Sequence, residues 1–431
     1  MKLFLKKIIV TLLEWEARLV LRKYKPRIIA VTGSVGKTTT KDAIYALLAP
    51  SFHVRKSEKS FNSEIGIPLT ILGVPNAWSN IVQWVKNLVE GFGLILLSSD
   101  YPRILVLEVG ADRPGDIKHV ASWLTPQTVV LTRFPDVPVH VEYFESPEHL
   151  IEEKMHLVKA VAPAGTLILN FDDPQTQSIS LPSKGSMLTY GMHDGADVVG
   201  TQVVDVYDTA GVVCGISFHV AYQHSSEQIV LNGVLGKQHI YPTLAALAVG
   251  ISEGLTLSAM ADELKEYAPP PGRMRLIKGI NESLIIDDTY NASPVATLEA
   301  LSVLATIKTE GNKIAVLGDM LELGNYSVPA HKEIGALVAQ SADRLVTVGI
   351  RSHYTAEMAN KKRMKKKSIT ITNDSREAGN KLKGNIGKGD VILVKGSQSM
   401  RMERVVEMLM AEPEKAKELL VRQDDVWRSK V

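Results

Sequence analysis

The chain has 431 residues, of which 45% are hydrophobic and 22% are charged, a balance typical of a globular protein with a sizeable core. Because this length exceeds one ordinary domain, two or three domains are expected. The 49 basic and 47 acidic residues leave a net charge of only +2, so the overall charge does not indicate a nucleic-acid partner. A single cysteine, Cys214, excludes an internal disulfide and fits a reducing cytoplasm.

Residues 1–24 read MKLFLKKIIVTLLEWEARLVLRKY, a basic and apolar stretch. Charged residues interrupt it too often for a membrane span, and it lacks the small-residue cleavage site of a signal peptide. Helical spacing predicts one polar stripe, made by Lys7, Thr11, Glu14, Arg18 and Arg22, and an opposite apolar side, made by Leu5, Ile8, Ile9, Leu12, Trp15 and Leu19. We interpret the segment as a helix packed on the body of the protein. Contact of residues 1–24 with a membrane surface is the alternative.

The next part of the chain alternates between strand-like and helix-like segments. RIIAV is a short β-branched run, KDAIYALLA reads as a helix, and a glycine-rich loop lies between them. Further apolar runs follow at RILVLEVGA, QTVVLTRF and GTLILNFDD, separated by segments such as SPEHLIEEKMHLVKAV. This alternation predicts a parallel sheet covered by helices. Residues 185–232 change in character and predict a small antiparallel patch.

EYAPPPGRM places three prolines and a glycine around Pro270, which predicts a stiff hinge and a domain boundary. Beyond it, SLIIDD, KIAVLGD, RLVTVG, SITIT and DVILVKGS alternate with helices again, as expected of a second, doubly wound α/β domain. We therefore expect an N-terminal helix at 1–25, a central domain at 26–269 and a C-terminal domain at 270–431. NKKRMKKK is interpreted as a solvated surface, with a nucleic-acid patch as the alternative.

The loop TGSVGKT follows a predicted strand and precedes a predicted helix, which is the context of a phosphate-binding loop. The usual pattern requires a glycine where this chain has Val31. Gly33 and Gly36 would let backbone amides turn toward phosphate oxygens at the start of the helix. Lys37 would reach the β- and γ-phosphates, and the Thr38 hydroxyl would hold Mg²⁺. An accidental Gly-Lys-Thr turn is the alternative interpretation.

Other polar residues give weaker signals when each is taken alone. Glu108 ends a predicted strand, where open α/β sheets place their ligands, and it is either a metal ligand or a surface charge. His140 and Lys154 lie fourteen residues apart, and they read as an ordinary histidine and a surface lysine. In the second domain, Arg273 follows the hinge, where it could grip a phosphate when the domains close. Asp288 ends a strand and suits ribose hydroxyls, or else caps a turn.

Taken in order, the motifs form a recognisable set: TGSVGKTTT, FNSEIGIPLT, EVGADRPGD, HVEYF, NFDD, PPGRM, IDDTYNASP, LGDMLELG and VKGSQSMRME. This set covers roughly residues 27–409 and resembles the Mur ligase family, the ATP-dependent amide-bond ligases of peptidoglycan synthesis. The family's loop is T-G-x-x-G-K-T/S, so Val31 is no defect. IDDTYNASP, LGDMLELG and VKGSQSMRME most resemble the members that add D-alanyl-D-alanine to a UDP-N-acetylmuramoyl tripeptide.

The resemblance implies the fold, a central P-loop ATPase domain with a C-terminal Rossmann-like α/β domain, and it implies a role for each candidate. The implied Mg²⁺ ligands are Thr38, Glu108, His140 and a carbamylated Lys154. The residues implied to bind ATP are Gly33, Ser34, Val35, Gly36, Lys37, Thr38, Thr39, Arg273 and Asp288. Lys37, His140 and Lys154 would act in catalysis, and Asn62, Tyr290, Asn291 and Lys395 would contact substrate. The substrate carboxylate would attack the γ-phosphate, and an amine would then displace phosphate.

The implied partners are a UDP-muramoyl peptide and D-alanyl-D-alanine, with no nucleic acid, and we expect a cytoplasmic monomer. Three departures from the family's pattern matter. The family places a UDP-holding domain ahead of the loop, whereas the first predicted strand here begins at Arg27. TRFPDVPVH replaces T-N-I-G-x-x-H before His140, and GKQH replaces G-x-H-N. The alternatives are a Mur-like ligase for another carboxylate and amine, or a non-catalytic P-loop regulatory protein. The joint presence of the candidate metal ligands and of Arg273 and Asp288, which would clamp ATP from the second domain, favours an enzyme.

Overall fold

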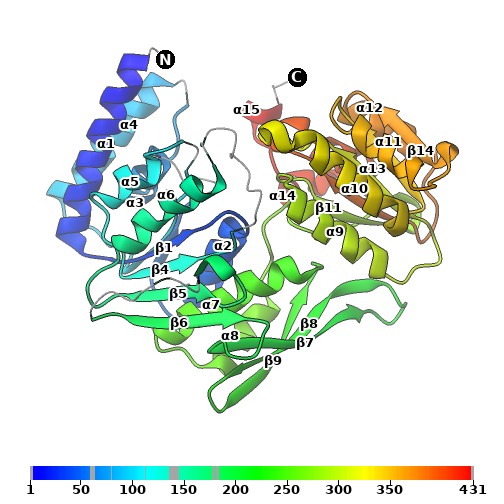
Figure 1. The fold of residues 1–431 in the computed structure, drawn as a ribbon. Helices are drawn as coiled ribbons and strands as arrows, with labels where there is room; N and C mark the ends of the chain where they lie inside the picture. Colours follow the sequence, from blue (N-terminus) through cyan, green and yellow to red (C-terminus); the bar gives the residue numbers. More distant parts are fainter. Residues whose placement is uncertain are drawn as a thin grey trace.

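The structure of the protein is a computed structural model, which describes residues 3–58, 64–78, 80–111, 113–134, 144, 146–176, 179 and 184–428. Two α/β units follow one another along the chain, each built on its own sheet (Figure 1). The predicted α/β class, with parallel-rich sheets and a preceding helix, is confirmed.

The first sheet has the strand order β2-β3-β1-β4-β5-β6-β7-β8-β9 in the described part of the chain. Its strands are β1 (Arg27–Thr32), β2 (Val54–Lys56), β3 (Ile104–Glu108), β4 (Thr128–Leu131), β5 (Thr166–Asn170), β6 (Ser186–Gly191), β7 (Val198–Tyr207), β8 (Val213–Tyr222) and β9 (Ser225–Asn232). Strands β1 to β6 pair in parallel, whereas β7, β8 and β9 pair antiparallel. The predicted antiparallel patch is present, but it continues the parallel sheet, because β6 pairs with the start of β7.

Helices cover both faces of this sheet, and β1 shows why. Its residues alternate between two cores: Ile29 and Val31 pack on one side, and Ile28 and Ala30 on the other. The first side is covered by α2 (Lys37–Leu48), α7 (Ile240–Ser252) and α8 (Leu257–Lys265). The second is covered by α1 (Leu3–Tyr24), α3 (Gly66–Leu72), α4 (Ile81–Leu96), α5 (Asp116–Ala121) and α6 (Pro147–Lys159).

The second sheet has the order β10-β11-β15-β12-β13-β14; β10 and β11 pair antiparallel, and the other neighbouring strands pair in parallel. Its strands are β10 (Arg275–Lys278), β11 (Leu284–Asp288), β12 (Lys313–Gly318), β13 (Arg344–Val348), β14 (Ile369–Thr372) and β15 (Val391–Lys395). Its helices are α9 (Pro294–Thr306), α10 (Ser327–Ser341), α11 (His353–Lys361), α12 (Ser375–Lys383), α13 (Glu403–Leu409), α14 (Ala416–Leu419) and α15 (Asp425–Arg428).

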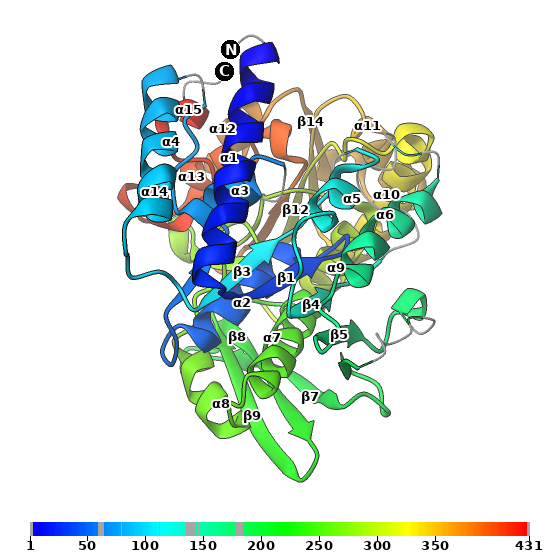
Figure 2. The ribbon, with the colours of Figure 1, turned by 90° about the vertical axis from the view of Figure 1, so that its left-hand side faces the viewer.

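Helix α1 packs against α3 and α4, as the preferred interpretation of this segment predicted (Figure 2). The predicted packing face is wrong in part. Ile9, Leu13, Ala17 and Val20 are buried, whereas Ile8, Leu12 and Trp15 are exposed. The helix is apolar around most of its circumference, so the spacing of polar residues could not tell which apolar side packs. Within the described ranges, no helix is long and apolar enough to cross a bilayer.

Candidate nucleotide and ligase site

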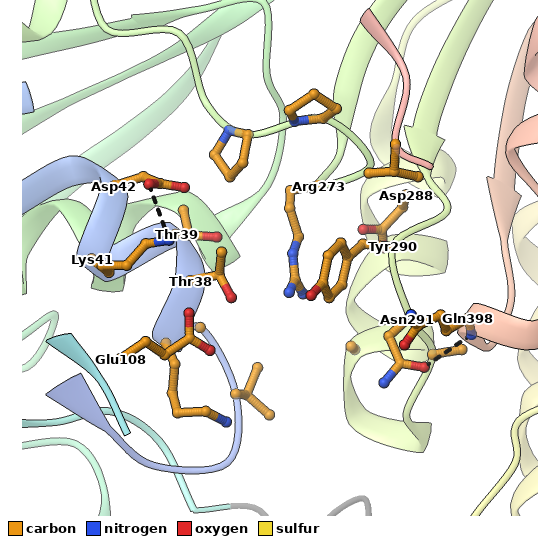
Figure 3. A pocket seen from close by; sticks show the side chains of 18 of the residues that line it. Thr38, Thr39, Lys41, Asp42, Glu108, Arg273, Asp288, Tyr290, Asn291 and Gln398 are labelled. Atoms are coloured by element: carbon orange, nitrogen blue, oxygen red, sulfur yellow. Dashed lines mark hydrogen bonds and ion pairs between the residues drawn. The ribbon is translucent and has the colours of Figure 1, made fainter. Parts of the chain in front are cut away.

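A cleft of about 1870 Å³ lies between the two units. Its lining includes the loop after β1, the end of β3, the segment after the prolines, the loop after β11 and the end of β15. Open α/β sheets bind ligands at the carboxyl ends of their strands. Here those ends come from both sheets and meet at one cleft. Figure 3 shows Thr38 and Glu108 on one side of it, and Arg273, Asp288 and Tyr290 on the other.

The glycine loop turns sharply from β1 into α2. Gly36 precedes the helix at φ 87°, and Gly33 has φ 138°, both in the region that favours glycine. A Cβ at Gly33 would lie 2.0 Å from Thr132 Oγ1, so no larger residue fits there. Among the described residues no side chain caps the start of α2, and the residues of its first turn line the cleft. This geometry suits a phosphate.

Two amides of the loop are already engaged. The Ser34 and Val35 amides donate to the Arg133 carbonyl at 3.0 and 3.2 Å, which ties the loop to the end of β4. Both residues still line the cleft, although these two amides face the protein. The amides that could hold phosphate therefore lie further along, in the first turn of α2, where Lys37, Thr38 and Thr39 also line the cleft.

Glu108 and Thr38 form the candidate metal side of the site. Glu108 ends β3 beside Val31 of β1, and it is 2% exposed. Its Oε2 has no hydrogen-bond partner among the described residues. A buried carboxylate oxygen without a partner is unfavourable unless a cation or proton meets it. Thr38 is buried in the first turn of α2, so its hydroxyl and the Glu108 carboxylate line the same end of the cleft.

Lys154 lies in α6 and is buried, so its interpretation as a surface lysine is wrong. Burial and the charge of Lys37 hold the pKa of its amine well below the usual range, against the opposing effect of Glu153. Glu153 accepts hydrogen bonds from the amides of Ile117 and Lys118 at 2.7 and 2.9 Å. The carboxylate therefore holds the start of α5 and leaves the neighbouring lysine as a buried, readily neutral amine.

Arg273 extends from the segment after the prolines into the cleft. Its guanidinium lies 4.0 Å from the centre of the Tyr290 ring, and its Nε has no hydrogen-bond partner within the described part of the chain. His239 of the central domain donates from Nε2 to the Arg273 carbonyl at 2.7 Å. Burial lowers the pKa of His239 to about 4, so the ring is neutral at physiological pH. His239 is the last residue of GKQH, so this bond connects the segment that departs from the family's G-x-H-N pattern to the backbone of Arg273.

Asp288 and Lys395 end neighbouring strands, β11 and β15, and form a buried ion pair at 2.6 Å. Lys395 also donates to the Asn291 carbonyl at 3.0 Å. The side-chain oxygen of Asn291 accepts a hydrogen bond from the backbone amide of Gln398 at 3.3 Å (Figure 3). Three of the four candidate substrate residues, Tyr290, Asn291 and Lys395, thus line the same side of the cleft as Asp288. In this arrangement, Lys395 holds Asp288 and its loop in place.

The structure adds a cluster that the sequence did not indicate, near the C-terminus. Arg422 is buried and donates to the carbonyls of Thr289 and Tyr290 and, at 3.0 Å, to Glu403. Glu403 also accepts from Arg401 at 2.5 Å. The segment that follows α13 therefore fastens the loop after Asp288. Arg422 lies outside the family motifs, whereas Arg401 and Glu403 belong to VKGSQSMRME, and only the fold shows that these three residues meet.

A second addition joins the two domains. Arg133, at the end of β4, pairs with Glu299 of α9 at 2.5 Å.

Two predicted residues, Asn62 and His140, lie outside the described residues. Among the residues that are described, no group of three or more histidine, cysteine or acidic side chains could hold a metal ion.

The fold and the cleft define a two-domain P-loop protein, in which a second α/β domain faces the nucleotide loop. Two family models match the chain: the Mur ligase middle domain at residues 31–250, and the Mur ligase, glutamate ligase domain at residues 272–398. The chain belongs to the Mur ligase family. The predicted resemblance is confirmed.

Relatives and solved structures agree with this assignment. The chain is 31% identical over 405 residues to the UDP-N-acetylmuramoyl-tripeptide--D-alanyl-D-alanine ligase of Bacillus subtilis (strain 168), across 94% of this chain and 80% of the relative. It is 28% identical over 390 residues to the enzyme of that name from Escherichia coli (strain K12), across 89% and 76%. It superimposes with a TM-score of 0.74 and 27% identity on the crystal structure of MurF ligase from Thermotoga maritima in complex with ADP, across 95% and 84%.

Proposed function

We propose that this protein is the ATP-dependent ligase that joins D-alanyl-D-alanine to a UDP-N-acetylmuramoyl tripeptide, releasing ADP and phosphate. One observation carries the proposal: a phosphate loop with a buried acidic strand end faces an arginine and an acidic strand end of a second domain across one cleft. A protein that only bound nucleotide would not need an arginine and an acidic strand end from a second domain. The names of the relatives supply the two substrates.

ATP would lie across the cleft. The first turn of α2 presents backbone amides and Lys37 to the phosphates, and the ADP complex of the Thermotoga maritima relative supports a nucleotide in this family's cleft. From the other side, Arg273 would contact phosphate, and Asp288, held by Lys395, would accept hydrogen bonds from ribose hydroxyls. The guanidinium of Arg273 is planar and always charged, which suits stabilisation of the negative charge that develops on phosphate oxygens during transfer.

Mg²⁺ fits the donor set on the central-domain side. Glu108 offers a buried carboxylate oxygen without a protein partner in the described ranges, and Thr38 offers a hydroxyl. Lys154 would contribute oxygen only as a carbamate, and its depressed pKa supplies the neutral amine that reacts with CO₂. His140 is the fourth proposed ligand. When bound, Mg²⁺ would neutralise charge on the transferring phosphate.

The reaction would proceed in two displacements. An oxygen of the substrate carboxylate attacks the γ-phosphorus, the bond from that phosphorus to the ADP oxygen breaks, and an acyl phosphate forms. The amine of D-alanyl-D-alanine then attacks the acyl carbon, loses a proton, and phosphate leaves. Lys37 and Arg273 would stabilise the phosphate oxygens from opposite domains, so positioning and charge do most of the work.

The remaining assignments are proposals of the same kind. Tyr290 and Asn291 line the cleft beside Arg273 and Asp288, where they would contact substrate together with Asn62. We further propose the domain boundaries 1–25, 26–269 and 270–431, a monomer, and a cytoplasmic location. The opening residue Arg27 of β1 and the prolines before Arg273 support the two boundaries.

A panel of substrates tests the function. Release of phosphate from ATP is measured with UDP-muramoyl peptides of different length, each with and without D-alanyl-D-alanine or another amino donor. We expect turnover only when the tripeptide nucleotide and D-alanyl-D-alanine are both present. Turnover with other pairs but not with this pair would overturn the substrate assignment and would leave the ligase chemistry standing.

A further inference from the structure

Helix α4 is apolar on its outward side as well as on its inward side, which differs from an ordinary surface helix. Its buried residues are Trp84, Asn87 and Gly91, of which Asn87 is polar. The exposed residues of α4 include the charged Lys86 and Glu90 and six apolar residues that are between 47% and 79% exposed, namely Ile81, Val82, Val85, Val89, Phe92 and Leu96. Amphipathic helices of globular proteins place such residues inward. Exposed apolar residues that recur along one side of a helix in this way indicate a candidate binding surface.

Neighbouring elements extend the strip. Leu97 follows α4 directly and is exposed, and Trp78, just before α4, is half exposed and also lines the cleft. Helix α1 lies beside α4 (Figure 2). It exposes Ile8, Leu12 and Trp15. We call these residues of α1, α4 and their flanks the α1/α4 apolar surface. The two helices lie side by side on the outside of the central domain (Figure 1).

The charges on α1 are mainly basic, and those on α4 are one exposed pair, Lys86 and Glu90. Helix α1 contains five basic residues and two acidic ones. Its acidic residues are engaged within the protein: Glu14 pairs with Arg18 and His119, and Glu16 is buried. Lys23 donates to the carbonyls of Leu94, Ile95 and Leu97, which places an exposed cation at the end of α4. Exposed apolar and tryptophan side chains with flanking cations complement an anionic lipid interface.

A second copy of the chain is the competing occupant, and the pattern on α4 disfavours it. Val82, Val85, Val89, Phe92 and Leu96 follow the spacing of a coiled-coil seam, but the positions beside that seam lack the paired charges that fix register and partner. On one side they are Ile81, Leu88 and Ile95, and on the other Lys86 and Gly93. A broad, mostly uncharged apolar face suits an interface without a defined register, which a lipid surface provides.

We propose that the α1/α4 apolar surface binds anionic lipid bilayers peripherally, with α4 lying in the interfacial plane. The original expectation of membrane contact concerned residues 1–24 alone, whereas the structure places most of the exposed apolar side chains on α4. Because Trp78 belongs both to this surface and to the lining of the cleft, binding would hold the mouth of the cleft close to the bilayer.

The test is co-sedimentation of the full chain with vesicles of phosphatidylglycerol and phosphatidylcholine, compared with vesicles of phosphatidylcholine alone. We expect binding to the anionic vesicles that weakens at high salt and falls by about tenfold or more in Val85→Glu/Val89→Glu. The control is Ile350→Glu, which changes an even more exposed apolar residue of the C-terminal domain and should bind like wild type. Melting temperatures check that each variant folds.

Two outcomes would overturn the proposal. The first is that the wild type stays in solution with anionic vesicles. The second is that Val85→Glu/Val89→Glu binds vesicles as wild type does. If instead light scattering after size exclusion finds a dimer that the double variant abolishes, while vesicles bind neither protein, the surface is a self-association face and the lipid assignment is wrong.

Discussion

Glu16 allows a quantitative test of how α1 is packed. Glu16 belongs to α1, and its side chain is buried where this helix packs against α4. Its Oε2 has no hydrogen-bond partner in the described part of the protein. A Cβ on Gly91 of α4 would lie 2.2 Å from this oxygen, so the two helices meet closely here. Burial raises the pKa of Glu16 from 4.5 to about 7.

The direction of the pH effect follows from this raised pKa. Below pH 4.5 the carboxyl is protonated in the folded and the unfolded protein. As the pH rises toward 7, the unfolded chain ionises first, and the folded state loses stability until its own carboxyl ionises. The difference in pKa corresponds to about 3 kcal/mol of unfolding free energy lost above pH 7.

Glu16→Gln keeps the shape of the side chain and cannot ionise. We expect it to raise the free energy of unfolding at pH 8 by about 3 kcal/mol and to change it little at pH 4.5. Urea unfolding at both pH values, followed by circular dichroism, measures the difference. Glu90→Gln, at an exposed position of α4, is the matched control and should have little effect at either pH. An equal gain at both pH values, or no gain at pH 8, would refute the reasoning.

Three further predictions concern the cleft. Lys154→Ala and Lys154→Arg should each lower the ligation rate on the order of 100-fold or more with the fold intact, and labelled bicarbonate should give a carbamate signal in wild type only. Near wild-type turnover in Lys154→Arg would exclude the carbamate. Arg273→Ala should lower turnover at saturating ATP about 100-fold without lowering the melting temperature, and unchanged turnover would remove it from the clamp. Arg422→Ala should destabilise the C-terminal domain by about 3 kcal/mol and raise the KM for ATP, because it leaves Glu403 short of a buried partner. Arg428→Ala, at an exposed pair, should do neither, and equal effects of the two substitutions would contradict the role of Arg422.

Strands with both faces buried, and loops with strict conformational demands, could be predicted from the sequence. The run ILVLE of β3 is apolar except at its end because helices cover both of its faces. Gly33 and Gly36 indicate the loop because both have backbone angles that favour glycine, and at Gly33 a Cβ would also clash with Thr132. Such local requirements leave a pattern in the sequence.

Features that depend on how elements distant in sequence pack against one another could not be predicted from the sequence. Lys154 occupies a helix with ordinary amphipathic spacing, and only the packing of α6 buries its amine. Arg422 lies beyond the family motifs and reaches the Tyr290 carbonyl across 132 residues of sequence. The exposed apolar face of α4 contradicts the usual rule that such faces point inward, so spacing alone would have buried it.

The central claim is that this cleft activates a carboxylate with ATP and passes it to an amine. The most direct measurement uses the UDP-N-acetylmuramoyl tripeptide with heavy oxygen in its terminal carboxylate, together with ATP and D-alanyl-D-alanine, and follows the products by mass spectrometry. Acyl transfer through a phosphate predicts that the peptide gains D-alanyl-D-alanine and that one heavy oxygen appears in each released phosphate. Hydrolysis of ATP to phosphate without heavy oxygen, and without extended peptide, would contradict the account.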